Sequence, residues 1–366
     1  MHERCNHRNM ETISQWIRRG LLPVDPSVAA CPDPICTACQ FGKVHRKSHA
    51  SNKGSIAAAC SQPGDSVSAD QLEAGYPGKI PFTKGLPTMK RYKYCNLLVD
   101  NYSRYIYPTF HETKHATELI QSKKEFQTFA AHHGVTIRKI RTDNGVYSVS
   151  PFQLSCEQDN QELSFYAVGS HWQNGIAERH IGIVTETAWT LLLHACSQWP
   201  DVFTEEFWPF AIHHACMLHN ASLRHDTKQS PHQIFTGVPS PWCIRDFRVF
   251  GCLVFVLNKR LQDGDSLPKW KARSWTGVYV GHSLQHAGNV LLIYNPATTH
   301  VSPQYHVVFD DQFKTVCGSA VSRDNLLQKL YDKALWSYKL PSVEATDLYL
   351  FESFWSDPPP LKKTSI

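Results

Sequence analysis

Three acidic residues, Asp70, Asp143 and Glu178, have the chemistry and surroundings of a divalent-metal site. Asp70 lies on a predicted strand, Asp143 directly follows another, and Glu178, within a predicted helix, is separated from Asp143 by 34 residues. Hard cations such as Mg²⁺ prefer carboxylate oxygens, and two-metal phosphoryl transfer needs several of them clustered where strand ends meet a helix. Taken singly, each would be an ordinary solvated carboxylate. As a set, they predict metal-assisted phosphoryl transfer.

A second set of residues offers nitrogen and sulfur ligands. Four residues separate His2 from His7, two separate Cys36 from Cys39, and 28 lie between the two pairs. Zn²⁺ is bound tetrahedrally by such sets, and a short segment without room for a large core is stabilised by the metal. We predict a structural zinc site here. The alternative is a solvated histidine pair beside an ordinary cysteine turn.

Residues 1–46 contain one helical stripe that would support this zinc site. Apolar residues recur at helical spacing and stop at Gly20 and Pro23: Ile13, Trp16, Ile17 and Leu21. Cys5 and Cys31 are rival ligands, although Cys5 is too close to His7 for a usual pair. This region is therefore expected to be a small helical domain.

Between residues 63 and 222 the pattern alternates between strand and helix. Strands are predicted at 66–73, 94–100, 104–110 and 136–142, and helices at 115–133, 175–196 and 204–220. Leu119, Ile120, Phe126, Phe129 and Ala130 are expected to face inward from the first of these helices. Three strands, a helix, a fourth strand and further helices form the order of a ribonuclease-H-like α/β core, a mixed sheet with flanking helices.

The helix at 175–196 carries Glu178 at the edge of its apolar stripe. The stripe consists of Ala177, Ile181, Val184, Ala188, Leu191 and Leu192. At that edge a carboxylate can point across the rim of the sheet while the helix stays packed.

Beyond residue 241 the pattern changes to β. Short strands at 248–257, 276–280, 289–294 and 301–309 are typical of a small barrel or meander. Between the first two strands the chain has a local excess of positive charge: Lys259, Arg260, Lys269, Lys271 and Arg273 against Asp263 and Asp265. The predicted organisation is a zinc-binding domain (1–46), a linker (47–62), the α/β core (63–222), a connector (223–247), a β-rich barrel (248–315) and a tail without a coherent element (316–366).

A rival metal motif occurs at His111-Glu112-Thr113-Lys114-His115, which fits the H-E-x-x-H pattern of zinc metalloproteases. That chemistry requires both histidines on one helix face. Here the motif spans a predicted strand end and helix start, and no third ligand is evident. We expect a solvated junction instead.

The composition narrows the class of protein. The 366 residues have 37 Lys and Arg against 32 Asp and Glu, a net charge of +5, and 42% are hydrophobic. A disordered chain is therefore excluded, and nucleic acid is permitted as a partner. Twelve cysteines are too few for a disulfide scaffold and favour a reducing compartment. Neither a membrane span nor a signal peptide is evident, so we expect an intracellular protein of nucleus and cytoplasm that lacks a clear targeting signal.

Several motifs in fixed order carry a family resemblance across about residues 1–315. They are the zinc pairs, Val67–Leu72 (VSADQL), Thr142–Gly145 (TDNG), His171–Arg179 (HWQNGIAER), Phe247–Cys252, Lys269–Gly281 and Val301–Asp311. Together they resemble the integrase of copia-type long-terminal-repeat retrotransposons.

The resemblance implies a polynucleotidyl transferase that trims the 3′ ends of element DNA and joins them to host DNA. Asp70, Asp143 and Glu178 match the family's catalytic triad, which uses Mg²⁺ or Mn²⁺. His2, His7, Cys36 and Cys39 match its structural Zn²⁺ site, and the β-rich block matches its DNA-binding barrel. Element ends, host target DNA and further copies of the chain are the implied partners, and the chain would be one piece of a longer polyprotein.

Eight residues are candidates for contacts with DNA. Five lie near the triad (Arg141, Trp172, Gln173, Asn174 and Arg179), and three lie in the β-rich block (Lys269, Lys271 and Arg273). Phosphate contacts of this kind are salt-sensitive and tolerant of sequence. As alternatives, Arg141 and Trp172 are packing or solvated residues, and Asn174 is a helix N-cap.

The chain departs from the family pattern at several points. Tyr147 stands where a glutamate is usual, the spacing before Glu178 is one residue short, and Trp189 and Trp275 replace expected basic residues. These departures keep open a relic that binds DNA and zinc without catalysis. A plain nuclease is the third alternative, which the predicted zinc domain and barrel disfavour.

Overall fold

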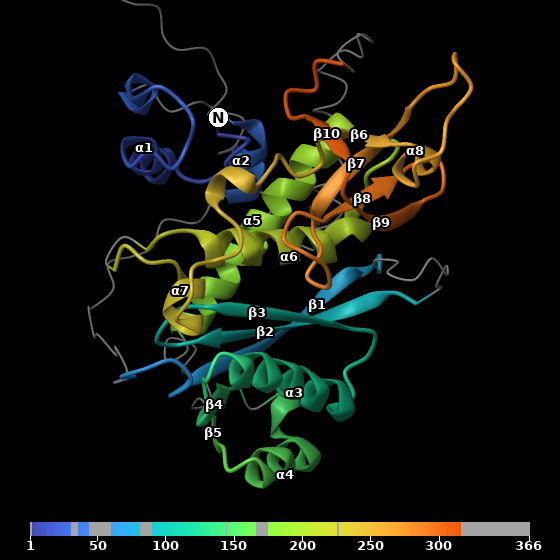
Figure 1. The fold of residues 1–366 in the computed structure, drawn as a ribbon. Coiled ribbons are helices and arrows are strands. Elements are labelled where there is room, and N and C mark those ends of the chain that lie inside the picture. Colours follow the sequence, from blue (N-terminus) through green and yellow to red (C-terminus); the bar gives the residue numbers. More distant parts are fainter. Residues whose placement is uncertain are drawn as a thin grey trace, which may run out of the picture. The chain divides into compact units, whose positions relative to one another are not determined.

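The computed structural model describes residues 2–30, 36–43, 60–80, 90–143, 145–165, 175–224 and 227–315, with side chains of the sixth range from residue 179 onward. Two five-stranded sheets and the helices packed against them account for most of these residues (Figure 1). Short 3-10 turns lie at Pro26–Ala30, Val146–Ser148, Glu205–Phe207 and Ile244–Asp246.

The first sheet has mixed direction. It contains β1 (Val67–Gly78), β2 (Tyr92–Asp100), β3 (Ile106–His111), β4 (Lys139–Thr142) and β5 (Glu162–Phe165). The strand order is β3-β2-β1-β4-β5. β1, β2 and β3 pair antiparallel, whereas β4 runs parallel to both β1 and β5. This order confirms the predicted ribonuclease-H-like core.

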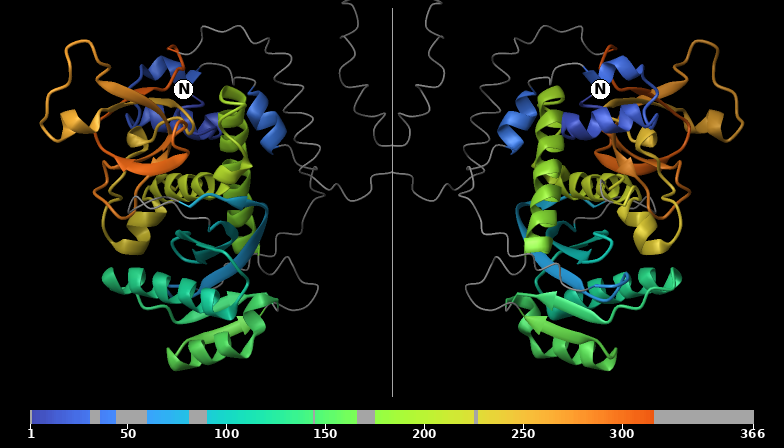
Figure 2. Two further views of the ribbon diagram at one scale, coloured as in Figure 1. Left: turned by 90° about the vertical axis from the view of Figure 1, so that its right-hand side faces the viewer. Right: turned by 90° about the vertical axis from the view of Figure 1, so that its left-hand side faces the viewer.

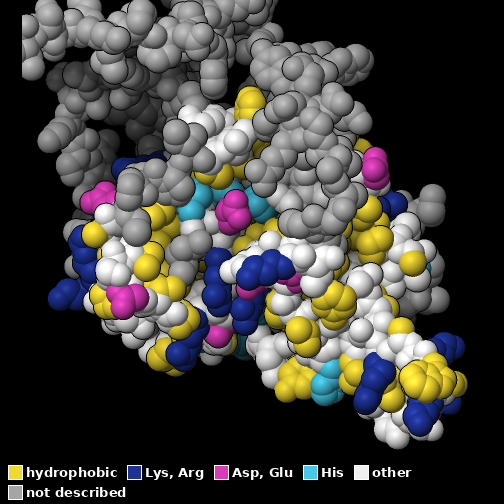
Figure 3. Space-filling view, turned by 90° about the horizontal axis from the view of Figure 1, so that it is seen from above, with side chains coloured by type: hydrophobic (Ala, Val, Ile, Leu, Met, Phe, Trp, Pro, Cys, Tyr) yellow, Lys and Arg dark blue, Asp and Glu magenta, His cyan; other side chains and the backbone are white. Residues whose placement is uncertain are grey.

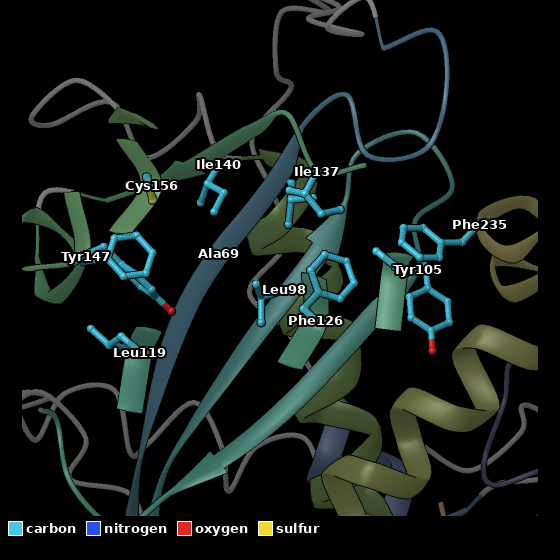
Figure 4. Packing of buried hydrophobic residues seen from close by; sticks show 13 residues of the cluster. Ala69, Leu98, Tyr105, Leu119, Phe126, Ile137, Ile140, Tyr147, Cys156 and Phe235 are labelled. Atoms are coloured by element: carbon cyan, nitrogen blue, oxygen red, sulfur yellow. The ribbon is translucent and has the colours of Figure 1, made fainter. Parts of the chain in front are cut away.

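Helices α3 (Ala116–His132) and α4 (Ser150–Gln158) pack with one face of this sheet. Their buried side chains join Val67, Ala69 and Leu98 in one apolar cluster (Figure 4). The predicted inward face of α3 is confirmed. Leu119, Phe126 and Ala130 are buried, and Ile120 and Phe129 are partly buried against the same cluster.

A buried lysine joins α3 to α4 beneath this cluster. The Lys123 side chain is 2% exposed, and its Nζ donates to Ser155 O at 2.7 Å, Asp159 Oδ2 at 2.6 Å and Gln161 Oε1 at 3.1 Å. The three acceptors compensate the desolvation of the ammonium. They also tie the helix pair to the start of β5.

The other helices are α5 (Gly175–Gln198) and α6 (Trp208–Ala221); α5 contacts β1 and β2, and α6 contacts β3 (Figure 2). The predicted stripe of α5 is buried at its described members, Ile181, Val184, Ala188, Leu191 and Leu192. Near the end of α6, Asn220 Nδ2 donates to Ile106 O at 2.8 Å, and its Oδ1 accepts from Ile106 N at 2.9 Å. Asn220 thereby supplies hydrogen-bond partners to both backbone groups of Ile106, on the edge strand β3.

The second sheet is antiparallel and follows helix α7 (Pro231–Thr236). It contains β6 (Leu253–Leu257), β7 (Ser274–His282), β8 (Leu291–Asn295), β9 (His300–Gln304) and β10 (Val307–Asp310), in the order β10-β6-β7-β8-β9. Helix α8 (Lys259–Gln262) lies between β6 and β7. Gly251, at φ +83°, brings the chain close to α5, where an added Cβ would lie 2.6 Å from Ala195 Cβ.

Three details of the predicted pattern were wrong. The single strand predicted at 301–309 is two strands, because the chain turns at Tyr305 and His306 before β10 pairs with β6. The strand predicted from residue 248 begins at Leu253. Helix α4 and strand β5 were not predicted, since both are short and Pro151 stands where α4 begins.

The N-terminal segment contains α1 (Met10–Arg18) and α2 (Thr37–Lys43). The predicted stripe is confirmed, since Ile13, Trp16 and Ile17 are buried. They pack in one cluster with side chains of α6, among them Met217 and Leu218. Of the predicted linker only residues 60–62 are described, and the predicted tail 316–366 lies outside the described residues.

Candidate functional site

The parallel pairing of β1 with β4 sets two of the three predicted carboxylates side by side. Val67 pairs with Ile140, and Ser68 pairs with Arg141. Asp70 and Asp143 lie two residues beyond the second pair, so they occupy matching positions in the register. Asp70 is half-buried, and Asp143 is exposed just after β4 ends. One carboxylate on β1 and one directly after the parallel strand β4 therefore lie at the same register level.

Local backbone geometry explains why glycine follows Asp143. A Cβ added at Gly145 would lie 2.9 Å from Asp143 Oδ2, so a side chain there would press on the carboxylate. Asp70 Oδ1 accepts a hydrogen bond from Gln71 N at 2.8 Å. Asp70 thus has a backbone donor, and the Asp143 carboxylate lies close to the Gly145 backbone.

Tyr147 lies within electrostatic reach of both acids. Burial raises the pKa of the Tyr147 hydroxyl, and the charges of Asp70 and Asp143 raise it further. Its side chain is 3% exposed and packs in the α3 and α4 cluster, where Figure 4 shows it beside β1. Tyr147 is thus a core residue near the two acids.

The third carboxylate belongs to the first turn of α5. Glu178 lies in this helix, which contacts β1 and β2, although its side chain lies outside the described residues. Of the predicted DNA contacts near it, Arg179 is exposed on α5 and Arg141 is half-buried on β4. The predicted contacts Trp172, Gln173 and Asn174 lie outside the described residues.

The four predicted zinc ligands converge. One ligand atom from each of His2, His7, Cys36 and Cys39 lies within 4.8 Å of the others. His2 Nε2 is 3.2 Å from Cys39 Sγ, and His7 Nδ1 is 3.2 Å from Cys36 Sγ and 3.7 Å from Cys39 Sγ. Nitrogen and sulfur ligands of a tetrahedral Zn²⁺ lie about 3.5 Å apart. The set therefore fits a zinc ion.

The two thiols of the cluster are shifted in opposite directions, because hydrogen bonding to Cys36 and burial raise the pKa of the Cys39 thiol. Hydrogen bonding to Cys39 and to the two histidines lowers the pKa of the Cys36 thiol, which favours the thiolate that binds metal. The rival ligand Cys5 is buried, and desolvation raises its pKa to about 11. Cys31, the other rival, lies outside the described residues.

Helix α5 supplies a neighbour to the zinc cluster that the sequence did not reveal. The His194 ring centroid lies 5.0 Å from that of His7, and His194 is 5% exposed. Helix α2 approaches α5 so closely that a Cβ at Gly42 would lie 2.4 Å from Thr190 Oγ1. Nothing in the local pattern links residues so distant in sequence, so only the tertiary contact shows that α5 carries both Glu178 and a neighbour of the zinc set.

The H-E-x-x-H pattern does not form a metal site in the structure. His111 ends β3, and its Nε2 lies 3.1 Å from Thr109 Oγ1 and 2.5 Å from Ser122 Oγ. His115 is the exposed N-cap of α3. The two histidines therefore do not share one helix face, as expected from the sequence.

The predicted DNA contacts Lys269, Lys271 and Arg273 are exposed between α8 and β7. They lie on the second sheet's connecting loop rather than on its paired strands. Within the described part of the chain, no helix is long and apolar enough to span a bilayer.

Known proteins resemble the chain only distantly. No protein-family model and no curated protein sequence matches it. Among solved structures it is similar to the HTLV-2 integrase catalytic core domain in complex with magnesium, with 19% identity and a TM-score of 0.35 over 48% of this chain and 97% of that one. It is also similar to the catalytic core domain of BIV integrase, with 12% identity and a TM-score of 0.33 over 47% of this chain and 93% of that one.

A longer match is the simian T-cell lymphotropic virus intasome in complex with PP2A regulatory subunit B56 gamma. It has 17% identity and a TM-score of 0.39, and covers 83% of this chain and 95% of that one. At sequence identities and TM-scores this low, the assignment of function depends on the chain's own residues and geometry.

Proposed function

We propose that the chain is the integrase of a copia-type retrotransposon, which processes the 3′ ends of element DNA and joins them to host DNA. One observation supports the proposal: β1 pairs parallel with β4 at Val67–Ile140 and Ser68–Arg141, two residues before Asp70 and Asp143, and α5, which carries Glu178, contacts β1. The motif order from the zinc pairs to the last strands supports it independently.

Asp70, Asp143 and Glu178 would hold Mg²⁺ or Mn²⁺. Their oxygens are the donor type that these hard cations prefer. When bound, such ions stabilise charge on the attacking and leaving oxygens of a phosphodiester. The chain's part would be to keep Asp70 and Asp143 close together through the pairing of β1 with β4. His2, His7, Cys36 and Cys39 would bind Zn²⁺, which has a structural role.

Nucleic acid is the partner that the charge distribution favours. Arg141 and Arg179 flank the acids in sequence, and three exposed basic residues project from the second sheet. Cations so placed contact phosphates and tolerate many base sequences. The proposal includes assembly of several copies on the DNA ends, and action in the nucleus after synthesis in the cytoplasm.

A strand-transfer assay tests the proposal. Purified protein, Mn²⁺ or Mg²⁺ and a labelled duplex with the element's terminal sequence are scored for joined products. Glu178→Gln and Asp143→Asn should abolish joining, whereas Glu157→Gln, at an exposed acid on α4, should not. DNA binding without joining in the unmodified protein would refute catalysis and leave the relic that binds DNA and zinc.

A further inference from the structure

The chain between β6 and β7 forms a protrusion closed at its neck. Asn258 N donates to Arg273 O at 2.8 Å, and Gln262 Nε2 donates to Leu257 O at 2.7 Å. The Asn258 side chain also accepts from Arg260 N at 3.2 Å, which caps α8. The bond between Asn258 and Arg273 holds the two ends of the protrusion together where β6 ends and β7 begins, and the other two bonds fix the turn at α8.

Within the protrusion, a tight turn shortly before β7 presents a tryptophan to solvent. Lys271 N donates to Pro268 O at 2.9 Å, so Lys269 and Trp270 occupy the two central positions of the turn. Trp270 is 92% exposed, whereas the next most exposed large hydrophobic residue in the described chain, Val308, is 67% exposed. Trp270 therefore contributes almost nothing to any core.

Other tryptophans of the chain have structural roles that Trp270 lacks. Trp199 Nε1 donates to Gly251 O at 2.7 Å, and Trp242 Nε1 donates to Gly288 O at 3.0 Å. Trp275, five residues after Trp270, packs against the core of the second sheet. The Trp270 ring is instead left in solvent, where its faces are free to contact a partner.

Positive charge surrounds the exposed ring. Lys269 Nζ lies 5.7 Å from the Trp270 ring centroid, and Lys271 and Arg273 are exposed nearby. The acidic residue Asp265 lies 3.9 Å from Arg260. Figure 3 shows Lys and Arg side chains gathered around hydrophobic ones at the lower right, on the side where Figure 1 draws α8.

We propose that Trp270 stacks on an unpaired nucleobase while Lys269, Lys271 and Arg273 contact the adjoining phosphates. This inference rests on the proposed function and adds the form of the nucleic acid. Three cations complement a phosphate backbone, and an indole matches the π-face of any base. Bases inside a duplex already stack on both faces, so the ring requires an unpaired base, as in a single-stranded overhang.

Binding to two matched DNA molecules tests this inference without catalysis. Fluorescence anisotropy in the absence of divalent metal compares a blunt duplex with the same duplex carrying a short 3′ single-stranded overhang. Trp270→Ala should weaken overhang binding by about five- to a hundredfold, the range expected for one stacked base. Trp270→Phe should restore most of it, and blunt-duplex binding should change less than twofold.

Tyr305→Ala is the matched control, because Tyr305 is an aromatic residue of the same sheet region that is 54% exposed. It should leave both affinities unchanged. Equal affinities of Trp270→Ala and the unmodified protein for the overhang would overturn the inference, as would an equal loss on both DNA molecules. If the unmodified protein prefers the overhang through Trp270 but does not join DNA, only the proposed function fails. If it joins DNA and Trp270→Ala binds normally, only this inference fails.

Discussion

His214 provides a sharp test of how burial governs stability. It lies on α6, which contacts β7 of the second sheet, and it is 0% exposed. Its ring centroid lies 5.5 Å from those of Phe247 and Phe250 and 5.7 Å from that of Tyr279. Neither ring nitrogen has a hydrogen-bond partner among the described residues. A polar, titratable ring thus occupies an aromatic pocket.

Burial lowers the pKa of His214 well below its ordinary value, and the nearby His282 and His213 lower it further. The unfolded chain, with a histidine pKa of about 6.5, then binds more protons than the native state as the pH falls. The contribution of neutral His214 to the free energy of unfolding is therefore fully present above about pH 6.5 and is lost progressively as the pH falls below that value. For His282, whose pKa burial lowers to about 4, the loss at pH 5 is about 2 kcal/mol. The loss at His214 should be comparable.

The perturbation is His214→Phe, which replaces the imidazole with an apolar ring of similar shape. It removes two unpartnered nitrogens and one proton-binding site. We expect the free energy of unfolding to rise by about 1 kcal/mol at pH 8 and by about 3 kcal/mol at pH 5. Urea unfolding followed by tryptophan fluorescence at both pH values measures this.

The decisive quantity is the difference between the two pH values. A steric cost of the larger ring lowers stability equally at pH 8 and pH 5, so it cancels. His132→Phe, at an exposed position on α3, is the control and should keep the original pH dependence. If His214→Phe lost as much stability between pH 8 and pH 5 as the unmodified protein, the argument from burial would be refuted.

Two further outcomes are expected. Cys39→Ser should lose one bound zinc per chain and speed amide exchange in α2, because the ligand cluster joins α2 to His2 and His7. Cys60→Ser, outside the cluster, is its control, and equal zinc content in both variants would contradict the assignment. Lys123→Met should lower the free energy of unfolding by about 2 kcal/mol, since Asp159 and Gln161 lose their buried donor. The neighbouring exposed Lys124→Met should change it little, and equal effects of the two would disprove the role of burial.

Local pattern was sufficient for the long elements of the chain. Ile13, Trp16 and Ile17 are buried on α1, and the apolar stripe of α5 is buried, because helical periodicity extends over several turns. Helix α4 was missed because its buried side chains, Phe152, Ser155 and Cys156, do not form an apolar stripe, and β5 was missed because it has only four residues. Strand β1 continues to Gly78, whereas the alternation of apolar and polar residues predicted a strand that ends at Glu73.

The sequence by itself determined which residue types can do chemistry and the order in which they occur. Two histidines and two cysteines with metal-ligand spacing, three carboxylates and a basic loop are visible without coordinates. Their chemistry depends only on side-chain identity, and the helices and strands that carry them depend on local periodicity. Both kinds of information are contained in short stretches of chain.

Only the tertiary structure decided which of these groups meet. The parallel register that aligns Asp70 with Asp143 depends on pairing between strands far apart in the chain. The packing of α2 on α5, which sets His194 beside His7, depends on the close approach at Gly42. It also decided that Trp270 stays in solvent while Trp275 is packed. Contacts between distant segments depend on packing and burial over the whole chain, so they cannot be predicted from any single short stretch of sequence.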